Sequence, residues 1–194
     1  LGNDRGDVLG HSFIIFLAPG LIGMSILTQS FSHSVSSLMI SKIQGNIVDM
    51  LYAPLSALEV SMAIILAAVT RSLIVELPIN SVLYIFIFGF LSAFILGSLG
   101  FIAGLWAEKF DHTATVTNFI ITPLSFLSGV FYSIDKLPDL FQNISYINPF
   151  FYMIDGFRYG FLGTSDASIK IGLFYLTILS VVMWFIAFNL YKKG

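Results

Sequence analysis

Two ionisable residues, Arg71 and Glu76, fall inside an apolar block at positions 57–77. A charge held deep in lipid costs about 2.5 kcal/mol or more, so a charged residue in a membrane segment is by default suspected of function. Arg71 lies only six residues before the end of its block, about 9 Å along a helix, and a long side chain reaches the interface from there. Two hypotheses stay open: a structural anchor or interhelical pair, which we favour, and a role in transport.

The other reactive side chains predict no catalytic, cofactor or metal site on this chain. His11, His33 and His112 fall in different segments, and none forms the two-histidine helical pair of a zinc site. There is no cysteine, so thiolate nucleophiles and thiolate metal ligands are excluded. No glycine-rich loop ends in Lys followed by Ser or Thr, and no nucleophile has an adjacent base. We therefore expect neither enzymatic activity nor ATP binding by such a loop.

The composition is that of a protein surrounded by lipid. Of 194 residues, 57% are hydrophobic and 10% are charged, against about 25% charged in a soluble domain, and the mean hydropathy is +0.91. The net charge of −2 leaves no basic surface that would follow a phosphate backbone, so nucleic acid is not expected as a partner. The predicted fold class is all-α, a polytopic membrane helical bundle in one domain over residues 1–194.

Block lengths predict five membrane spans. A crossing needs about 20 mainly apolar residues, and five blocks separated by polar segments meet this length, at positions 11–33, 57–77, 81–107, 113–132 and 169–190. Small residues recur in the third block, where four-residue spacing favours close helix packing within or between subunits. These residues are Gly89, Ala93, Gly97, Gly100 and Gly104.

The segment 34–56 between the first two blocks is amphipathic, with apolar residues three to four apart and polar residues between them. Gly45 is placed to break this pattern, and Asn46 to cap a short helix at 47–52. Pro54 would limit that helix at its far end. We expect a small helix lying across one end of the bundle.

The segment 133–168 contains two apolar pieces, 137–147 and 150–162, each too short to cross a membrane. Interfacial or re-entrant helices are therefore expected. Asn148 as the cap and Pro149 as the first helical residue would start the second piece.

The distribution of lysine and arginine gives a weak indication of orientation. If the segment 34–56 is cytoplasmic, each side collects four basic residues, but Lys192 and Lys193 stand directly at a span end. Arg158 is expected in the re-entrant piece, paired with Asp155. We therefore place 34–56 in the cytoplasm and 133–168 outside.

Taken in order, these features resemble the permease subunit of type-2 ATP-binding-cassette exporters, which include drug-efflux and polysaccharide or lipid export permeases. The resemblance covers nearly the whole chain. It is carried by FLAPGLIGMSILTQSF, KIQGNIVDMLYAPLSALE, FLSGVFYSIDKLP and ISYINPFFYMIDGFRYGFLG.

The resemblance implies a six-span subunit in the inner membrane of a bacterium. Such a subunit works as a pair, here expected to be a homodimer in lipid, with an ATPase partner that binds ATP and Mg. The family's first span has no counterpart in this chain, which begins with Leu1, and we interpret the chain as a piece whose beginning is missing. Efflux by alternating access is the implied activity.

The family's ATPase-coupling segment corresponds to residues 42–59. An interfacial connector with caps would explain the same residues, and a membrane-embedded enzyme or scaffold is the alternative to a transporter. An ATPase encoded beside this chain or purifying with it would separate these possibilities. The residues expected to couple to the ATPase are Gln44, Gly45, Asp49, Met50, Leu51 and Pro54.

Overall fold

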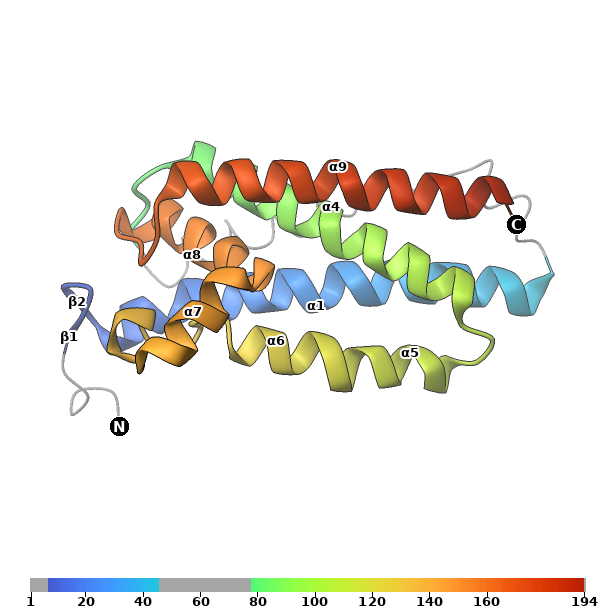
Figure 1. Ribbon diagram of the computed structural model, residues 1–194, viewed down its shortest axis with the longest axis horizontal. Coiled ribbons are helices and arrows are strands. Elements are labelled where there is room, and N and C mark those ends of the chain that lie inside the picture. The colour runs from blue at the N-terminus through green and yellow to red at the C-terminus, as the bar shows by residue number, and fades with distance from the viewer. Residues whose placement is uncertain (1–6, 46–77, 194) are drawn as a thin grey trace.

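The computed structural model describes residues 7–45 and 78–193, which form a bundle of helices (Figure 1). The described chain begins with a small antiparallel hairpin of β1, Asp7–Val8, and β2, His11–Ser12. Leu9 and Gly10 between them both have positive φ, which is the backbone geometry of tight hairpin turns. The hairpin lies next to the beginning of the first helix.

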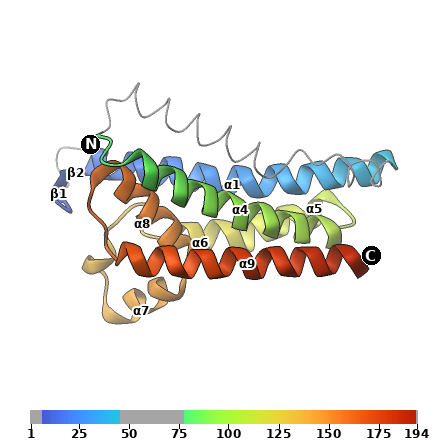
Figure 2. The ribbon, with the colours of Figure 1, turned by 90° about the horizontal axis from the view of Figure 1, so that it is seen from above.

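Three helices in the described part of the chain are long and apolar enough to cross a membrane. They are α1, Phe13–Gln44, α4, Val82–Trp106, and α9, Ile169–Lys193. Their long axes run along the bundle, and α4 contacts both α1 and α9 (Figures 1 and 2). The third and fifth predicted spans are confirmed as helices of the required length.

The first predicted span is too short, because α1 continues past His33 to Gln44 as one helix. No glycine or proline interrupts the chain between these positions. Val35, Leu38 and Met39 continue the helical spacing of buried residues, so packing favours a longer helix. The break comes at Gly45, whose φ of 73° is the left-handed conformation common after a helix end. The predicted short helix at 47–52 lies outside the described residues, as does the predicted span at 57–77.

The fourth predicted span, 113–132, is shifted and interrupted in the structure. Three consecutive pieces run from Phe110 to Phe126: α5, Phe110–Val116, the π-helical η1, Thr117–Ile121, and α6, Thr122–Phe126. Together they cover roughly 26 Å at 1.5 Å per residue. Pro123 has no backbone N–H to offer the preceding turn, and a π turn is one way in which a helix accommodates such a gap. The residues after Phe126 form turns, with Gly129 at a φ of 75°, and therefore do not extend the span.

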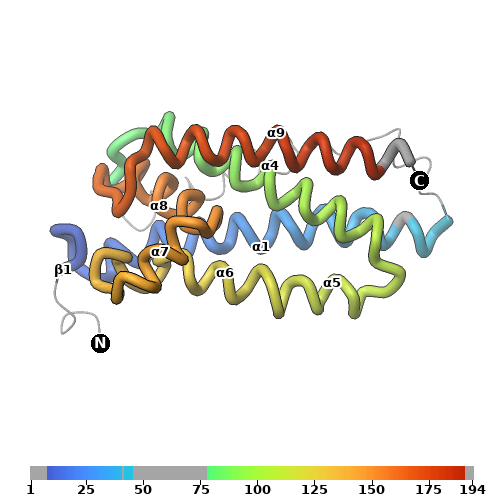
Figure 3. The backbone as a smooth tube through the Cα atoms, in the orientation of Figure 1, coloured from blue at the N-terminus to red at the C-terminus, as the bar shows by residue number. Residues whose placement is uncertain are grey.

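The segment 133–168 forms η2, Ile134–Lys136, α7, Asp139–Ile147, and α8, Pro149–Leu162. Both predicted apolar pieces are confirmed as short helices, and neither is long enough to cross. Most residues of α8 are buried, and α8 packs against α1, α4 and α9. The backbone trace shows α7 and α8 together at the hairpin end of the bundle (Figure 3).

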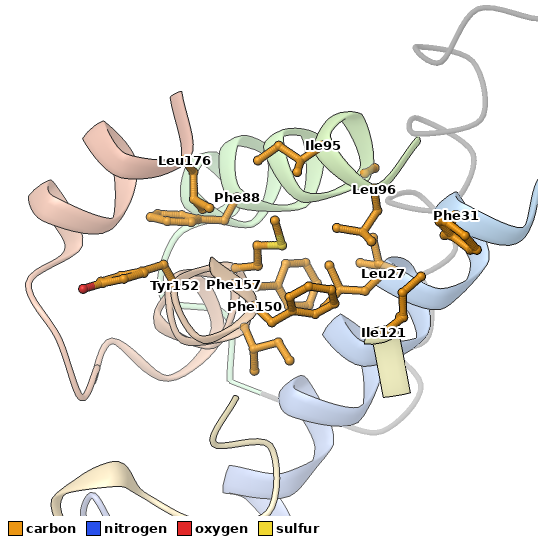
Figure 4. Close-up of a cluster of buried hydrophobic side chains, with 14 of the residues drawn as sticks. Leu27, Phe31, Phe88, Ile95, Leu96, Ile121, Phe150, Tyr152, Phe157 and Leu176 are labelled. Carbon is orange, nitrogen blue, oxygen red and sulfur yellow. The ribbon is translucent and has the colours of Figure 1, made fainter. Parts of the chain in front are cut away.

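The core lies where α8 meets the long helices. Leu27 and Phe31 of α1, Phe88 of α4 and Phe157 of α8 are all buried, and their side chains gather in one cluster (Figure 4). Gly156 leaves room for the Phe88 ring, because a Cβ at this position would overlap it. Close contact with α4 therefore requires glycine on α8.

Three of the small residues predicted on the third span, Gly97, Gly100 and Gly104, form a seam against α1. A Cβ on Gly100 would lie 2.6 Å from the Phe31 carbonyl oxygen, and one on Gly104 would lie 2.9 Å from Cδ1 of Leu38. Close backbone approach of this kind stabilises helix pairs in lipid, where burial of apolar surface gives little driving force. The seam therefore packs within the subunit.

Replacing Gly100 with alanine should force α1 and α4 apart, because the new methyl group meets backbone rather than a movable side chain. We expect a loss of about 1–3 kcal/mol in the free energy of unfolding, measured by thermal unfolding of the purified chain in detergent. Gly97→Ala is the matched control, since a Cβ there would lie 3.4 Å from Oγ of Ser34, an ordinary contact. Equal effects of the two substitutions would contradict the seam.

Candidate functional site

A buried ion pair joins α8 to the loop that follows it. The side chains of Arg158 and Asp166 are 1% and 0% exposed, and Nη1 of Arg158 lies 3.7 Å from Oδ2 of Asp166. Nη2 of Arg158 also donates a hydrogen bond of 2.7 Å to the Gly129 carbonyl oxygen. Ser133 donates its hydroxyl to Oδ1 of Asp166. The pair thus connects α8, the loop after it and the turns after α6.

The structure pairs Arg158 directly with Asp166 rather than with Asp155, although the charges of Asp155 and Arg158 also attract each other. Asp155 accepts hydrogen bonds from the backbone amides of Asp166, at 2.9 Å, and Ala167, at 3.1 Å. The two carboxylates therefore have different partners: Asp155 binds the loop backbone, and Asp166 forms the ion pair with the guanidinium. Sequence reasoning missed Asp166, although it is the last acidic residue of the chain and follows the last arginine within the same segment, 133–168.

The first turns of α1 complete the site. Cζ of Arg158 stands 3.9 Å from the centre of the Phe16 ring, in cation–π geometry. A Cβ on Gly20 would lie 3.2 Å from Nη2 of Arg158 and 3.1 Å from the Val130 carbonyl oxygen. Glycine at this position therefore lets α1 approach both the guanidinium and the turn after α6.

The charges of the site are unequal, with two carboxylates against one guanidinium. Burial raises the pKa of Asp155 to about 6, against the opposing effects of the two backbone amides and of Arg158. Burial also raises the pKa of Asp166, while the Ser133 hydrogen bond and the Arg158 charge lower it. Removing a carboxylate from water disfavours its charged form, so the site favours binding a proton in weakly acidic solution.

Asn148 and Pro149 act as predicted at the start of α8. Oδ1 of Asn148 accepts a 3.0 Å hydrogen bond from the Phe150 amide, and Pro149 is the first helical residue. Nδ2 of Asn148 donates to the Leu124 carbonyl oxygen at 2.9 Å. The cap therefore also ties the beginning of α8 to α6.

The opposite end of α1 carries the beginning of the predicted coupling segment. Gln44 and Gly45 are exposed there, at the end of the helix. Lys42, in the last turn, donates hydrogen bonds of 2.8 Å to the carbonyl oxygens of Leu105 and Ala107. The other predicted coupling residues and the charged pair of the second span lie outside the described residues and stay predictions: Asp49, Met50, Leu51, Pro54, Arg71 and Glu76.

One face of α5 and η1 exposes polar side chains beside a large aromatic ring. Thr115 and Asn118 are exposed, and the adjacent Phe119 is 77% exposed. The Thr115 hydroxyl is satisfied by the Asp111 carbonyl oxygen at 2.9 Å. Over residues 7–45 and 78–193, no three His, Asp or Glu side chains are grouped as metal ligands would be.

Comparison with known proteins decides the family. Residues 6–162 match the family model described as "ABC-2 type transporter". The chain belongs to the ABC-2 type transporter family. The inner membrane transport permease YadH of Escherichia coli K12 is 32% identical, over 100% of this chain and 80% of that protein. Nodulation protein J is 26% identical in Sinorhizobium fredii and 27% identical in Rhizobium leguminosarum, again over the whole chain and over 79% and 80% of those proteins.

Family and fold together establish a permease subunit of an ABC-2 type transporter, a multi-pass integral protein of the inner membrane. The residues of the network in α1 and α8 fall within the matched range, and Asp166 lies four residues beyond its end at residue 162. The network holds α8 on the end of the bundle.

Replacing Arg158 with leucine should destabilise the permease by about 3–5 kcal/mol, because it leaves the Asp166 carboxylate buried without its partner. The double variant Arg158→Leu with Asp166→Leu should be less destabilised than Arg158→Leu alone. Thermal unfolding of the three variants and the unmodified chain gives the coupling energy. Strictly additive effects would show that the two side chains do not interact.

Stability should also rise as the pH falls from 7.5 to 5. The folded chain holds the Asp155 proton with a pKa of about 6, against the ordinary value of 3.8 in the unfolded chain. The stabilisation is therefore complete below pH 3.8 and lost as the pH rises through 6, so we expect a gain of about 1–1.5 kcal/mol at pH 5. The Asp155→Asn variant should show a weaker pH dependence of stability, because only the Asp166 contribution remains. A wild-type melting temperature that does not change over this range would contradict the prediction.

Proposed function

We propose that this permease forms the substrate pathway of an ATP-driven exporter by alternating access, together with a second copy of itself and an ATPase partner. The observation that carries the proposal is the match of the whole chain to an inner membrane transport permease of the ABC-2 family. ATP and Mg would be bound by the partner, and this chain would catalyse no reaction.

The exposed polar face of α5 and η1 supports a pathway between two copies. Exposed polar groups on a spanning helix are unfavourable against lipid tails, and such residues usually face a bundle interior, a partner or a water-filled cavity. Thr115 and Asn118 lie on this face, and Phe119 beside them offers an aromatic surface. We assign this face to the contact with the second copy and to the pathway between the copies.

The end of α1 at Gly45 supports coupling through the segment that follows it. The helix runs without interruption from the buried network near Phe16 to Gln44, so a force applied at its Gly45 end would act along its whole length. In this proposal the residues from Gln44 to Pro54 contact the ATPase, as the resemblance to type-2 exporters implies. Movement of α1 together with the helices packed on it, relative to the second copy, would then open and close the pathway.

Replacing Met50 and Leu51 together with aspartate should abolish association with the ATPase, because a helix docked in a groove depends on a few apolar anchors. Association is measured by co-purification of the tagged permease with the ATPase encoded beside it. The matched control replaces Leu140 and Phe141, which are 68% and 47% exposed on α7, with the same two charges. That control should retain the ATPase, and both variants should insert in the membrane.

Normal association and transport by the Met50→Asp, Leu51→Asp variant would remove the coupling assignment and leave residues 42–59 as an interfacial connector. If the unmodified permease itself recovers no ATPase, the transporter proposal fails, and the scaffold alternative gains support.

A further inference from the structure

We propose that Lys42 fastens the Gly45 end of α1 to the end of α4, so that the two helices move as one unit when the segment after α1 is displaced. The inference rests on the proposed function for the source of that displacement. It assigns a positioning role to a residue that sequence reasoning placed only at the edge of the coupling segment.

The geometry of the fastening is specific. Nζ of Lys42 donates to two carbonyl oxygens, those of Leu105 and Ala107, both at 2.8 Å. The last carbonyl groups of a helix lack partners within the helix and carry the negative end of its dipole. An ammonium group has three donors and no acceptor, so it suits this position. Lys42 therefore caps α4 from the side of α1.

The fastening also continues the glycine seam. Leu38, one turn before Lys42, packs so closely on Gly104 that a side chain at position 104 would overlap it. Phe31 packs on Gly100 in the same way. Ala107 is 0% exposed, so the Lys42 hydrogen bonds reach a well-packed end of α4. The seam keeps the two helices close, and the two hydrogen bonds fix their ends against sliding and rotation.

The two hydrogen bonds of Lys42 matter because packing is sparse in the last turn of α1. Ile43 is 69% exposed, and Gln44 and Gly45 are exposed as well. The final turn of α1 thus has a small apolar contact area with which to follow α4, and helix ends open readily where few buried contacts hold them. The hydrogen bonds from Lys42 would therefore transmit to α4 a displacement of the chain that follows Gly45.

The test measures the distance between the two helix ends in the full chain in lipid nanodiscs. Because the chain has no cysteine, Ile40→Cys on α1 and Glu108→Cys just after α4 can each carry a spin label, and both positions are exposed. Pulsed electron paramagnetic resonance gives the distance distribution for Lys42, Lys42→Met and Lys42→Arg. Lys109→Met, which removes an exposed lysine next to one label, is the matched control.

We expect Lys42→Met to roughly double the width of the distribution, because the freed helix ends open locally. Lys42→Arg should restore a narrow distribution, since a guanidinium can also donate to both carbonyl groups, and Lys109→Met should leave it unchanged. A distribution for Lys42→Met equal to that of the unmodified chain would overturn the proposal, even if its melting temperature were lower.

A second arm separates this inference from the proposed function. In the complex with the ATPase, a non-hydrolysable ATP analogue should leave the distance between the labels unchanged in the Lys42 chain and alter it in Lys42→Met. If no complex forms, the proposed function fails, while the nanodisc measurement still decides whether Lys42 holds the helix ends. If the complex forms and Lys42→Met responds to the analogue as the Lys42 chain does, the proposal for Lys42 alone is wrong.

Discussion

The close approach of α4 to its neighbours is the constraint on which the rest of the bundle depends. Lipid gives little apolar driving force for helix association, so the helices must gain their stability from contact between surfaces that fit. Gly100 brings α4 against the backbone of α1, and Gly156 and Gly160 bring α8 against Phe88 and Ile85 of α4. With α9 packed on a further side, α4 sets the spacing of every long helix that the structure describes.

The buried charges are the second constraint, and they follow from the position of α8. A helix too short to cross the membrane ends inside the protein, so the loop after it needs partners for its backbone groups. Asp155 supplies them to two amides, and Arg158 balances the charge that Asp166 brings with the loop. Removing charges from water is expensive, and a buried pair adds little net stability compared with apolar packing. Its contribution here is to fix where the loop and α8 lie against Phe16 and Gly129.

Local sequence signals predicted what local physics decides. Asn148 and Pro149 marked the start of α8 because a cap and a fixed φ act within one turn, and block length was enough to identify α4 and α9. The partner of Arg158 depended on how a later loop folds back, which spacing along one helix does not reveal. The length of α1 was underestimated because polar residues after His33 were taken to mark its end, although packing on α4 continues to Leu38 and Met39.

The arrangement also indicates where movement between the helices is least restrained. Alpha1 is held near Phe16 by the buried network and near Gln44 by Lys42, with the glycine seam between them. The run from Phe110 to Phe126 contacts α4 through α5 and α8 through α6, and Ile121 of η1 joins the core cluster. It also contains the π turn, which lengthens one turn of the backbone and weakens the regular hydrogen-bond ladder. We therefore expect a displacement that moves α1, α4 and α8 together to be accommodated at the π turn, on the side of the bundle that exposes Thr115 and Asn118.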